Sequence, residues 1–223
     1  MLNYKIQNYT KAGYMEHSDA MGITQRSIKR LFDIVFSLVG LVVLSPLFLV
    51  FSIILLFSKG PVIFRQERIG YKGKPFTIYK FRTMSIDAET DGIPRLEAER
   101  NRYLTPFGRF LRAHHLDELP QLWNVLIGDM SLVGPRPEVE RYVKLYTPSQ
   151  RVVLSVKPGI TDYASIAFSE ENIILGRAKN PEKMYIQEIM PKKIEINLQY
   201  INNRNLKEYF KIIFLTFVKI LKH

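Results

Sequence analysis

The chain has 223 residues and a mass of 26.1 kDa, the size of one domain or of one domain with an attachment. Its 32 Lys and Arg residues outnumber its 21 Asp and Glu residues, and the net charge of +11 favours a polyanion or an anionic lipid surface as partner. The absence of Cys excludes disulfide bonds, thiolate nucleophiles and Cys-ligated zinc.

The first 26 residues are polar and mixed in charge. They contain no basic stretch that leads into a short apolar core and a cleavage site, as a signal peptide would. We therefore interpret residues 1–26 as a loosely ordered extension.

The run from Ile34 to Ser58 contains 25 residues, and none of them is Asp, Glu, Lys, Arg or His. As a straight helix it would be about 37 Å long, which exceeds the roughly 30 Å hydrocarbon core of a bilayer. Pro46 stands near its centre, where it removes an intrahelical hydrogen bond and clashes with the preceding turn. We expect a helix break there, with the hydroxyl of Ser45 bonded to a carbonyl that the break frees.

The two sides of this run carry charge of the same sign, and Glu67 is the only acidic residue between positions 59 and 82. The flanking basic residues are Arg26, Lys29 and Arg30 before the run and Lys59, Arg65, Arg68, Lys72, Lys74, Lys80 and Arg82 after it. Because positive residues mark the cytoplasmic side of a membrane segment, we favour a re-entrant hairpin over residues 27–59. A kinked span is the main alternative. A core helix of a soluble protein is less favoured, because a helix this long would be apolar all round.

Residues 60–223 are predicted to form a compact mixed α/β domain. The runs PVIFRQERIG and KPFTIYKFRTM are β-rich, and GYKGKP forms the turn between them. Residues 85–100 are expected to be a loop running into a helix. Within them, DAETDG matches the first residues of a calcium-binding loop. Ala98 stands where such a loop requires a bidentate carboxylate, so we do not expect calcium there.

The second half of this domain is predicted to be mainly helical. LDELPQLWNVLIG has the spacing of a helix that stops at Gly128, and residues 182–205 are expected to form another. The apolar positions at helical spacing in the first of these are Leu119, Leu122, Trp123 and Leu126. GPRPE and KPGIT are predicted to be rigid turns.

The C-terminal segment from Lys207 to Lys222 is predicted to be an amphipathic helix. One side carries Lys207, Glu208, Lys211, Lys219 and Lys222, and the opposite side carries Phe210, Ile213, Phe214, Phe217 and Leu221. A basic stripe above a Phe-rich face suits a helix that lies in the lipid interface. Packing of the same face against its own domain is an equal alternative.

HHLDE, residues 114–118, is the first candidate for chemistry. Asp117 and Glu118 stand shortly before Pro120, which a helix tolerates only in its first turn, so Asp117 is predicted at or just before a helix N-terminus. A helix cap is the ordinary role of such an Asp, although Pro120 lacks one of the usual N–H partners. His114 and His115 could suggest a metal site, but adjacent histidines rarely face one ion, and we favour a solvated pair.

The arginines form a second candidate set. Arg82, Arg109, Arg112 and Arg136 are spread along the chain among Gly and Pro residues instead of gathering on one helix face. An Arg side chain binds phosphate through a planar fork. A carboxylate beside several arginines suits an aspartyl nucleophile that attacks a phosphoryl group. Surface ion pairs are the alternative interpretation.

Four motifs occur in order between Ser27 and Thr161: KRLFDIVFS followed by LSP, KPFTIYKFRTM, LRAHHLDELPQLWNVLIGDMSLVGPRPE, and KPGIT. Together they resemble the bacterial sugar transferase family, the small monotopic polyprenyl-phosphate hexose-1-phosphate transferases. The resemblance implies a monotopic membrane protein with a re-entrant helix broken at Ser-Pro. It also implies a catalytic domain on the cytoplasmic face of the inner membrane.

The activity implied by the resemblance is transfer of a sugar-1-phosphate from a UDP-sugar to undecaprenyl phosphate, with release of UMP. This step starts the assembly of a surface glycan. The implied reaction has two steps, uses a covalent nucleophile from an Asp-Glu pair, and requires magnesium. The implied partners are the UDP-sugar, undecaprenyl phosphate and membrane lipid, but not nucleic acid.

The resemblance also assigns roles to residues. Asp117 corresponds to the nucleophile and Glu118 to its partner, with Mg²⁺ held near both. The residues that correspond to phosphate or substrate ligands are Lys80 and Arg82 in the Lys-Phe-Arg-Thr-Met stretch, Arg112, and Arg136 in Gly-Pro-Arg-Pro. Ser45 and Pro46 correspond to the helix break.

One region departs from the family. After Pro-Gly-Ile-Thr the commonest pattern is Gly-Trp-Ala-Gln-Val-Asn-Gly-Arg, whose last Arg is another anion ligand. This chain has Asp162 at the first of these positions and Ser169 at the last. Arg177 or Lys179 is a candidate substitute for the missing arginine.

Two functions of other classes compete with the transferase. A non-catalytic, membrane-attached basic module could bind anionic lipid or nucleic acid through the positive stretch of residues 59–82. A metal-dependent phosphodiesterase could use His114 and His115, and it would hydrolyse the donor without a lipid acceptor.

Overall fold

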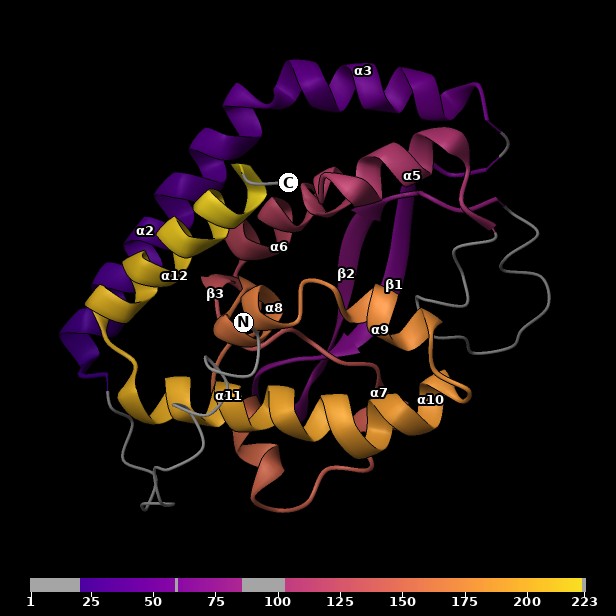
Figure 1. Cartoon of the computed structure of the whole chain (residues 1–223). Helices are drawn as coiled ribbons and strands as arrows, with labels where there is room; N and C mark the ends of the chain where they lie inside the picture. The colour runs from indigo at the N-terminus through magenta and orange to yellow at the C-terminus, as the bar shows by residue number, and fades with distance from the viewer. Residues whose placement is uncertain (1–20, 59, 86–102, 222–223) are drawn as a thin grey trace.

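The computed structural model of the chain describes residues 21–58, 60–85 and 103–221 (Figure 1). Most of the predicted N-terminal extension and the DAETDG segment therefore lie outside the described residues. Figure 1 shows α2 (Ile23–Val43) and α12 (Leu206–Leu221) side by side along one flank, α3 (Ser45–Leu56) above α5 (Pro106–Ala113), and α11 (Met190–Asn203) along the edge opposite α3.

The apolar run forms two helices, α2 (Ile23–Val43) and α3 (Ser45–Leu56), which are bent by 58° relative to each other. The hydroxyl of Ser45 donates to the carbonyl of Val42 at 2.7 Å, which confirms both the break and its predicted hydrogen bond. Among the described residues, no single helix is long and apolar enough to cross a bilayer. Taken together, the two helices of the bent pair have the length and apolar composition to do so.

Both halves of the bent pair pack against one domain. On α2, the guanidinium of Arg30 donates to the carbonyls of Val125 and Leu126 at 2.6 and 2.8 Å. On α3, Phe51 and Leu55 are buried against the side chains of a strand and of helix α5. The outward side chains of α2 and α3 are apolar and exposed: Leu31, Val35, Phe36, Leu38, Val39, Val42, Val43, Leu49, Val50, Ile53, Ile54 and Leu56. The pair is therefore not a buried core helix.

Two small sheets form the centre of the domain. The strands β1 (Ile63–Ile69) and β2 (Pro75–Phe81) pair antiparallel, with Ile63 opposite Phe81, and a tight turn at residues 71–73 joins them. This confirms the predicted hairpin. The strands β3 (Ser131–Val133) and β4 (Gly159–Thr161) pair in parallel.

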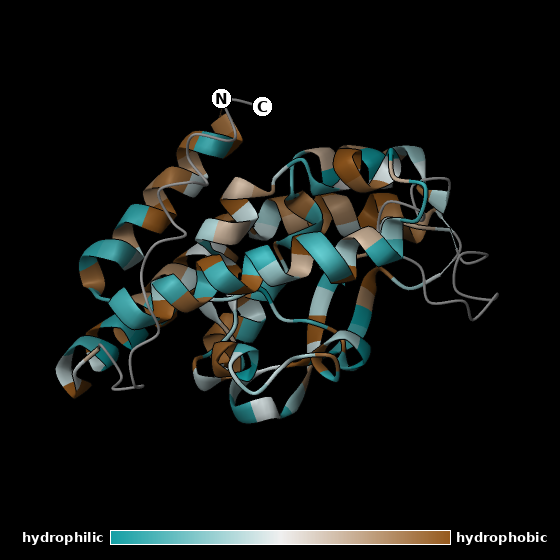
Figure 2. Cartoon of the chain, turned by 60° about the horizontal axis from the view of Figure 1, so that its bottom comes forward, coloured by the Kyte–Doolittle hydropathy of each residue, from teal (hydrophilic) through white to brown (hydrophobic). Residues whose placement is uncertain are grey.

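The remaining elements are helices and short turns. The helices are α5 (Pro106–Ala113), α6 (Gln121–Ile127), α7 (Glu140–Val143), α8 (Tyr163–Ala167), α9 (Glu171–Gly176), α10 (Pro181–Met184), α11 (Met190–Asn203) and α12 (Leu206–Leu221). A π-helical turn (Tyr185–Ile189) joins α10 to α11, so the prediction of helix over residues 182–205 is confirmed. Hydrophilic and hydrophobic residues are interspersed along α11 (Figure 2). Its buried residues Ile194, Leu198 and Ile201 pack in the main hydrophobic core, together with Val133 and Tyr142.

Helix α6 ends at Gly128 with φ of 98°, as predicted, but it begins only at Gln121, after a 3-10 turn over Leu116–Glu118. The buried side of α6 is not the apolar side that the spacing in the sequence indicated. Trp123 is 50 % exposed, whereas Asn124 is fully buried. The amide of Asn124 donates to the carbonyl of Thr77 at 2.7 Å and accepts the N–H of Tyr79 at 3.2 Å. A polar side chain thus joins α6 to the backbone of β2.

Helix α12 uses a face that lies between the two predicted ones. Tyr209 and Ile212 are fully buried in the main core, while Phe214 and Phe217 are 64 % and 60 % exposed. Packing against its own domain therefore accounts for one face of α12 but leaves much of the Phe-rich face uncovered. That exposed face lies beside α2, where the ring of Phe210 meets that of Phe32 edge-on at 4.9 Å.

Candidate active site

A cleft of about 370 Å³ opens between the β1–β2 hairpin, the turn before α6 and the segments from α7 to α11. All six residues predicted to act at the site line this cleft: Lys80, Arg82, Arg112, Asp117, Glu118 and Arg136. Segments far apart in the sequence thus meet at one place, as the resemblance implied.

The end of β2 provides the first wall. Lys80 and Arg82 are two residues apart on an extended chain, so their side chains leave the same face. Helix α5 crosses closely at Gly108, where an added Cβ would lie only 1.9 Å from the carbonyl oxygen of Thr83. This close approach lets the Nε of Arg112 donate to the hydroxyl of Thr83 at 3.1 Å.

The turn between α5 and α6 provides the carboxylates. His115 adopts a left-handed conformation with φ of 55°, which reverses the chain and starts the 3-10 turn that carries Asp117 and Glu118. Asp117 is 5 % exposed and lines the cleft. Pro120 is the cap residue of α6. Asp117 therefore does not occupy the cap position that was considered for it.

Glu118 is held by two cations. Arg136 donates from Nη1 to Oε2 at 3.0 Å and from Nη2 to Oε1, and Lys80 donates to Oε1 at 2.8 Å. Burial raises the pKa of Glu118, but the charges of Arg136 and Lys80 and their hydrogen bonds lower it by more, so the pKa lies well below its ordinary value. Glu118 therefore stays ionised at neutral pH and fixes both cations beside Asp117.

Arg82 has a structural contact in addition to its place in the cleft wall. Its Nη2 donates to the carbonyls of Leu55 and Ser58 at 3.1 and 3.2 Å, at the C-terminus of α3. These contacts join the C-terminal end of the bent pair to the wall of the cleft. Arg109, the fourth arginine of the predicted set, does not line the cleft.

The two histidines do not form a metal site together. His114 is exposed, and its Nδ1 lies 2.9 Å from the carbonyl of Phe110, whereas His115 faces the cleft. Across the described ranges, no group of three or more His, Cys, Asp or Glu side chains is arranged to hold a metal ion. The adjacent carboxylates of Asp117 and Glu118 are the acidic pair that faces the cleft at this end.

The far end of the cleft contains residues that the motifs did not indicate. Ser169 lines it, but Arg177 and Lys179, the predicted substitutes for the missing arginine, do not. Further cations that line the cleft are Arg68, Arg141 and Lys193. Lys193 pairs with Glu171 at 2.7 Å. No local motif marks this pair, since its members lie on α9 and α11.

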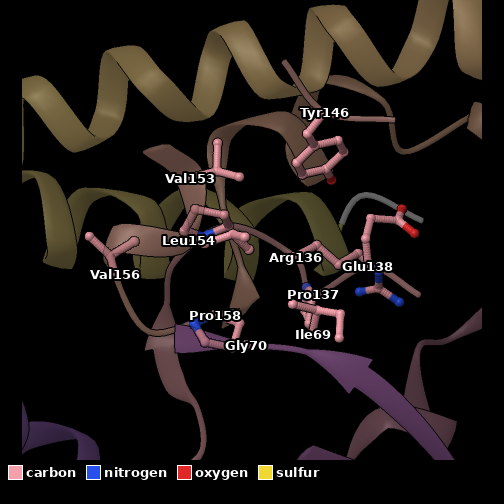
Figure 3. Close-up of a pocket in the computed structure, with 11 residues that line it drawn as sticks. Ile69, Gly70, Arg136, Pro137, Glu138, Tyr146, Val153, Leu154, Val156 and Pro158 are labelled. Atoms are coloured by element: carbon pink, nitrogen blue, oxygen red, sulfur yellow. The ribbon is translucent and has the colours of Figure 1, made fainter. Parts of the chain in front are cut away.

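The loop that carries Arg136 is packed from behind (Figure 3). Pro137 and Glu138 lie across a small pocket from Val153 and Leu154, and the pocket volume is about 20 Å³. That is room for about one water molecule. The loop therefore has little free space behind it.

The profile of the family described as bacterial sugar transferase matches residues 24–223. The chain belongs to the bacterial sugar transferase family. This match spans the bent helix pair and the whole cleft, so both are parts of one sugar transferase unit.

The relatives of this sugar transferase are similar over half to most of its length. The sugar transferase EpsL of Bacillus subtilis is 40 % identical over 196 residues, which are 87 % of each chain. The UDP-glucose:undecaprenyl-phosphate glucose-1-phosphate transferase of Klebsiella pneumoniae is 42 % identical over 196 residues, 86 % of this chain but 39 % of that protein. A putative undecaprenyl-phosphate N-acetylgalactosaminyl 1-phosphate transferase of Bacillus subtilis is 51 % identical over 113 residues, 50 % of this chain and 63 % of that protein.

Proposed function

We propose that this protein transfers a sugar-1-phosphate from a UDP-sugar to undecaprenyl phosphate with release of UMP, and so starts the assembly of a surface glycan. Its membership of the sugar transferase family and the activities named for the Klebsiella and Bacillus relatives support this proposal. The observation that carries it is the buried Asp117 in a cleft lined by Lys80, Arg82, Arg112 and Arg136.

In the first step, a carboxylate oxygen of Asp117 attacks the phosphorus that bears the sugar. A bond forms between that oxygen and the phosphorus, the bond to the bridging oxygen breaks, and UMP leaves. Positive charge from Arg112 and Arg136 offsets the charge that builds on the phosphoryl oxygens. Glu118 holds Lys80 and Arg136 in place during this step.

In the second step, a phosphate oxygen of undecaprenyl phosphate attacks the same phosphorus. The bond to Asp117 breaks, the carboxylate is restored, and the product is the lipid diphosphate sugar. Each step exchanges one P–O bond for another, so neither needs an external oxidant, reductant or added water.

Magnesium is the proposed cofactor. It is commonly bound through one or two carboxylates together with water and substrate phosphates, so Asp117 would supply a ligand oxygen to an ion that arrives with the pyrophosphate, while Glu118, whose oxygens accept from Arg136 and Lys80, would lie beside it. When bound, Mg²⁺ would neutralise the pyrophosphate charge that otherwise repels the attacking carboxylate.

The bent pair α2 and α3 is proposed to enter the cytoplasmic leaflet of the inner membrane and return. Two observations support this: both helices contact the same domain, and their outward side chains are apolar and exposed. The exposed Phe214 and Phe217 of α12 would lie in the same lipid interface. Undecaprenyl phosphate, a lipid, would then meet a water-soluble donor at the cleft.

Release of UMP from a panel of UDP-sugars, with and without undecaprenyl phosphate, tests this function. We expect sustained UMP release that requires both the acceptor and one preferred donor. A non-catalytic basic module would release no UMP, and a phosphodiesterase would cleave the donor at the same rate without the acceptor. Either result would overturn the proposal.

A further inference from the structure

Asp162 is a buried carboxylate behind the loop that carries Arg136. Its exposure is 0 %, and it follows β4 directly. Its Oδ2 accepts the backbone N–H of Arg136 at 2.9 Å, and its Oδ1 accepts the N–H of Ser165 at 2.6 Å, which caps α8. The side chain therefore joins the loop after β3 to the start of α8.

This link is strong because a buried carboxylate depends on its donors. An ionised oxygen makes shorter and stronger hydrogen bonds than a neutral one, and it is costly to leave such an oxygen unsatisfied inside a protein. Burial raises the pKa of Asp162 above its ordinary value, and the N–H groups of Ser165 and Arg136 and the charge of Lys193 offset this only in part. Release of the Arg136 N–H would remove one of these compensating contacts.

In this loop, the contact with Asp162 depends on a single backbone amide, that of Arg136. Pro135 and Pro137 flank Arg136, and neither has an N–H group. The backbone is further fixed where Gly134 donates to the carbonyl of Thr161 at 3.1 Å and Gly159 donates to that of Pro135 at 3.0 Å. With room for only about one water behind the loop, the position of the Arg136 backbone is closely set (Figure 3).

We propose that Asp162 is a positioning residue for the transfer reaction, which holds the backbone of Arg136 so that its guanidinium engages both oxygens of Glu118 at the cleft. The inference rests on the proposed function. Asp162 does not line the cleft, and it acts through Arg136.

Two substitutions separate the contacts of Asp162. Asp162→Ala removes both acceptors, whereas Asp162→Asn keeps one acceptor oxygen and can satisfy only one of the two N–H groups. Asn180→Ala is the matched control, because Asn180 also caps a helix by accepting the N–H of Lys183 at 2.9 Å and does not line the cleft. We expect kcat/KM to fall about 10- to 100-fold in Asp162→Ala, since a displacement of about 1 Å at a catalytic group has an effect of that order. The fall should be smaller in Asp162→Asn and absent in Asn180→Ala.

A double-mutant cycle distinguishes positioning from loss of structure. Combined with Arg136→Lys, which keeps the charge but loses the two-pronged contact, Asp162→Ala should cause no further loss of kcat/KM. Losses that multiply would mean that Asp162 acts independently of Arg136, and they would overturn the inference.

Hydrogen exchange supplies a readout that does not depend on activity. In the segment 134–138 only Gly134, Arg136 and Glu138 have a backbone N–H, so the Arg136 signal is readily assigned. Exchange at Arg136 should be faster in Asp162→Ala than in the native chain, and unchanged in Asn180→Ala. Unchanged exchange in Asp162→Ala would overturn the inference. A native chain that releases no UMP would instead overturn the proposed function, while the exchange data would still decide whether Asp162 holds the loop.

Discussion

Two regions of the molecule differ from an ordinary protein surface in opposite ways: the cleft around Glu118 and the outer face of α2 and α3. In the cleft, charged side chains are largely withdrawn from water and paired: Glu118 contacts both Lys80 and Arg136. On the bent pair, apolar side chains such as Leu49 remain exposed over the length of both helices. Buried charges require partners, and a large exposed apolar face requires another surface. The comparison indicates one region built for a phosphorylated ligand and one built for an apolar environment.

If the two regions have these separate roles, changes in the cleft should abolish transfer without releasing the protein from membranes. Asp117→Asn should reduce UMP release by at least about 10³-fold, because it removes the nucleophile and leaves the shape of the side chain nearly unchanged. Glu118→Gln should also be severely impaired, because both Lys80 and Arg136 would lose their ionic partner. Activity is measured on membranes, and attachment by sedimentation with them.

Asp129→Asn serves as the control for Asp117→Asn, because Asp129 is an acidic residue on the same part of the chain that does not line the cleft. It should retain native activity. Near-normal turnover by Asp117→Asn would exclude the covalent aspartyl reaction for this chain.

The cation requirement is the second test of the cleft. Chelation by EDTA should stop UMP release, since the carboxylate of Asp117 cannot approach a pyrophosphate whose charge is not neutralised. Added Mg²⁺ should restore the rate, and membrane attachment should be unaffected throughout. Activity that survived thorough chelation would contradict the proposed role of the metal.

Local sequence signals predicted much of this arrangement. The β1–β2 hairpin followed from two β-rich runs around a Gly-containing turn, and the break at Ser45 followed from the backbone chemistry of proline. The residues of the cleft wall followed from the family resemblance that the four motifs carry.

The remainder depends on tertiary contacts that no local pattern records. Asn124 is buried because its amide bonds the backbone of β2, which its place in the sequence does not indicate. The face on which α12 packs is set by Tyr209, whose hydroxyl donates to Asp33 on the distant helix α2 at 2.9 Å. Lys193 and Glu171 likewise meet across two helices at the far end of the cleft.

The attachment of α2 to the domain gives a prediction on stability. Asp33 is 2 % exposed and accepts hydrogen bonds from Ser131, from the N–H of Leu132 and from Tyr209. Asp33→Ala should lower the free energy of unfolding by about 3 kcal/mol, because it leaves Lys29, its ion-pair partner, uncompensated.

The thermal or denaturant midpoint measures this change in stability. Ser27→Ala is the control, since Ser27 lies on the same helix and its hydroxyl makes only an exposed contact with the carbonyl of Ile23. An equal effect of the two substitutions would show that Asp33 does not anchor α2.

The smallest expected effect is on the arrangement of the bent pair in the membrane, re-entrant or spanning. Replacing Ser45 with Ala and Pro46 with Leu restores an unbroken apolar helix of spanning length and should move part of the population to a transmembrane arrangement. The shift should be partial, because Arg26, Lys29 and Arg30 still favour the cytoplasm.

Cysteine labelling of intact cells measures this shift, because the native chain has no Cys. Single cysteines near Ser18 and near Lys222 should both be protected from an impermeant reagent in the native arrangement. Labelling near Ser18 from outside in the otherwise unchanged chain would exclude the re-entrant arrangement.

The central claim is that Asp117 carries the sugar-phosphate between donor and acceptor. Intact-protein mass spectrometry of the purified enzyme, mixed with its UDP-sugar and Mg²⁺ but without undecaprenyl phosphate, tests it most directly. We predict an added mass of one sugar-phosphate, UMP release stoichiometric with enzyme, loss of the adduct when the acceptor is added, and no adduct in Asp117→Asn. UMP formation that requires the acceptor from the first turnover, with no adduct at any time, would contradict the account.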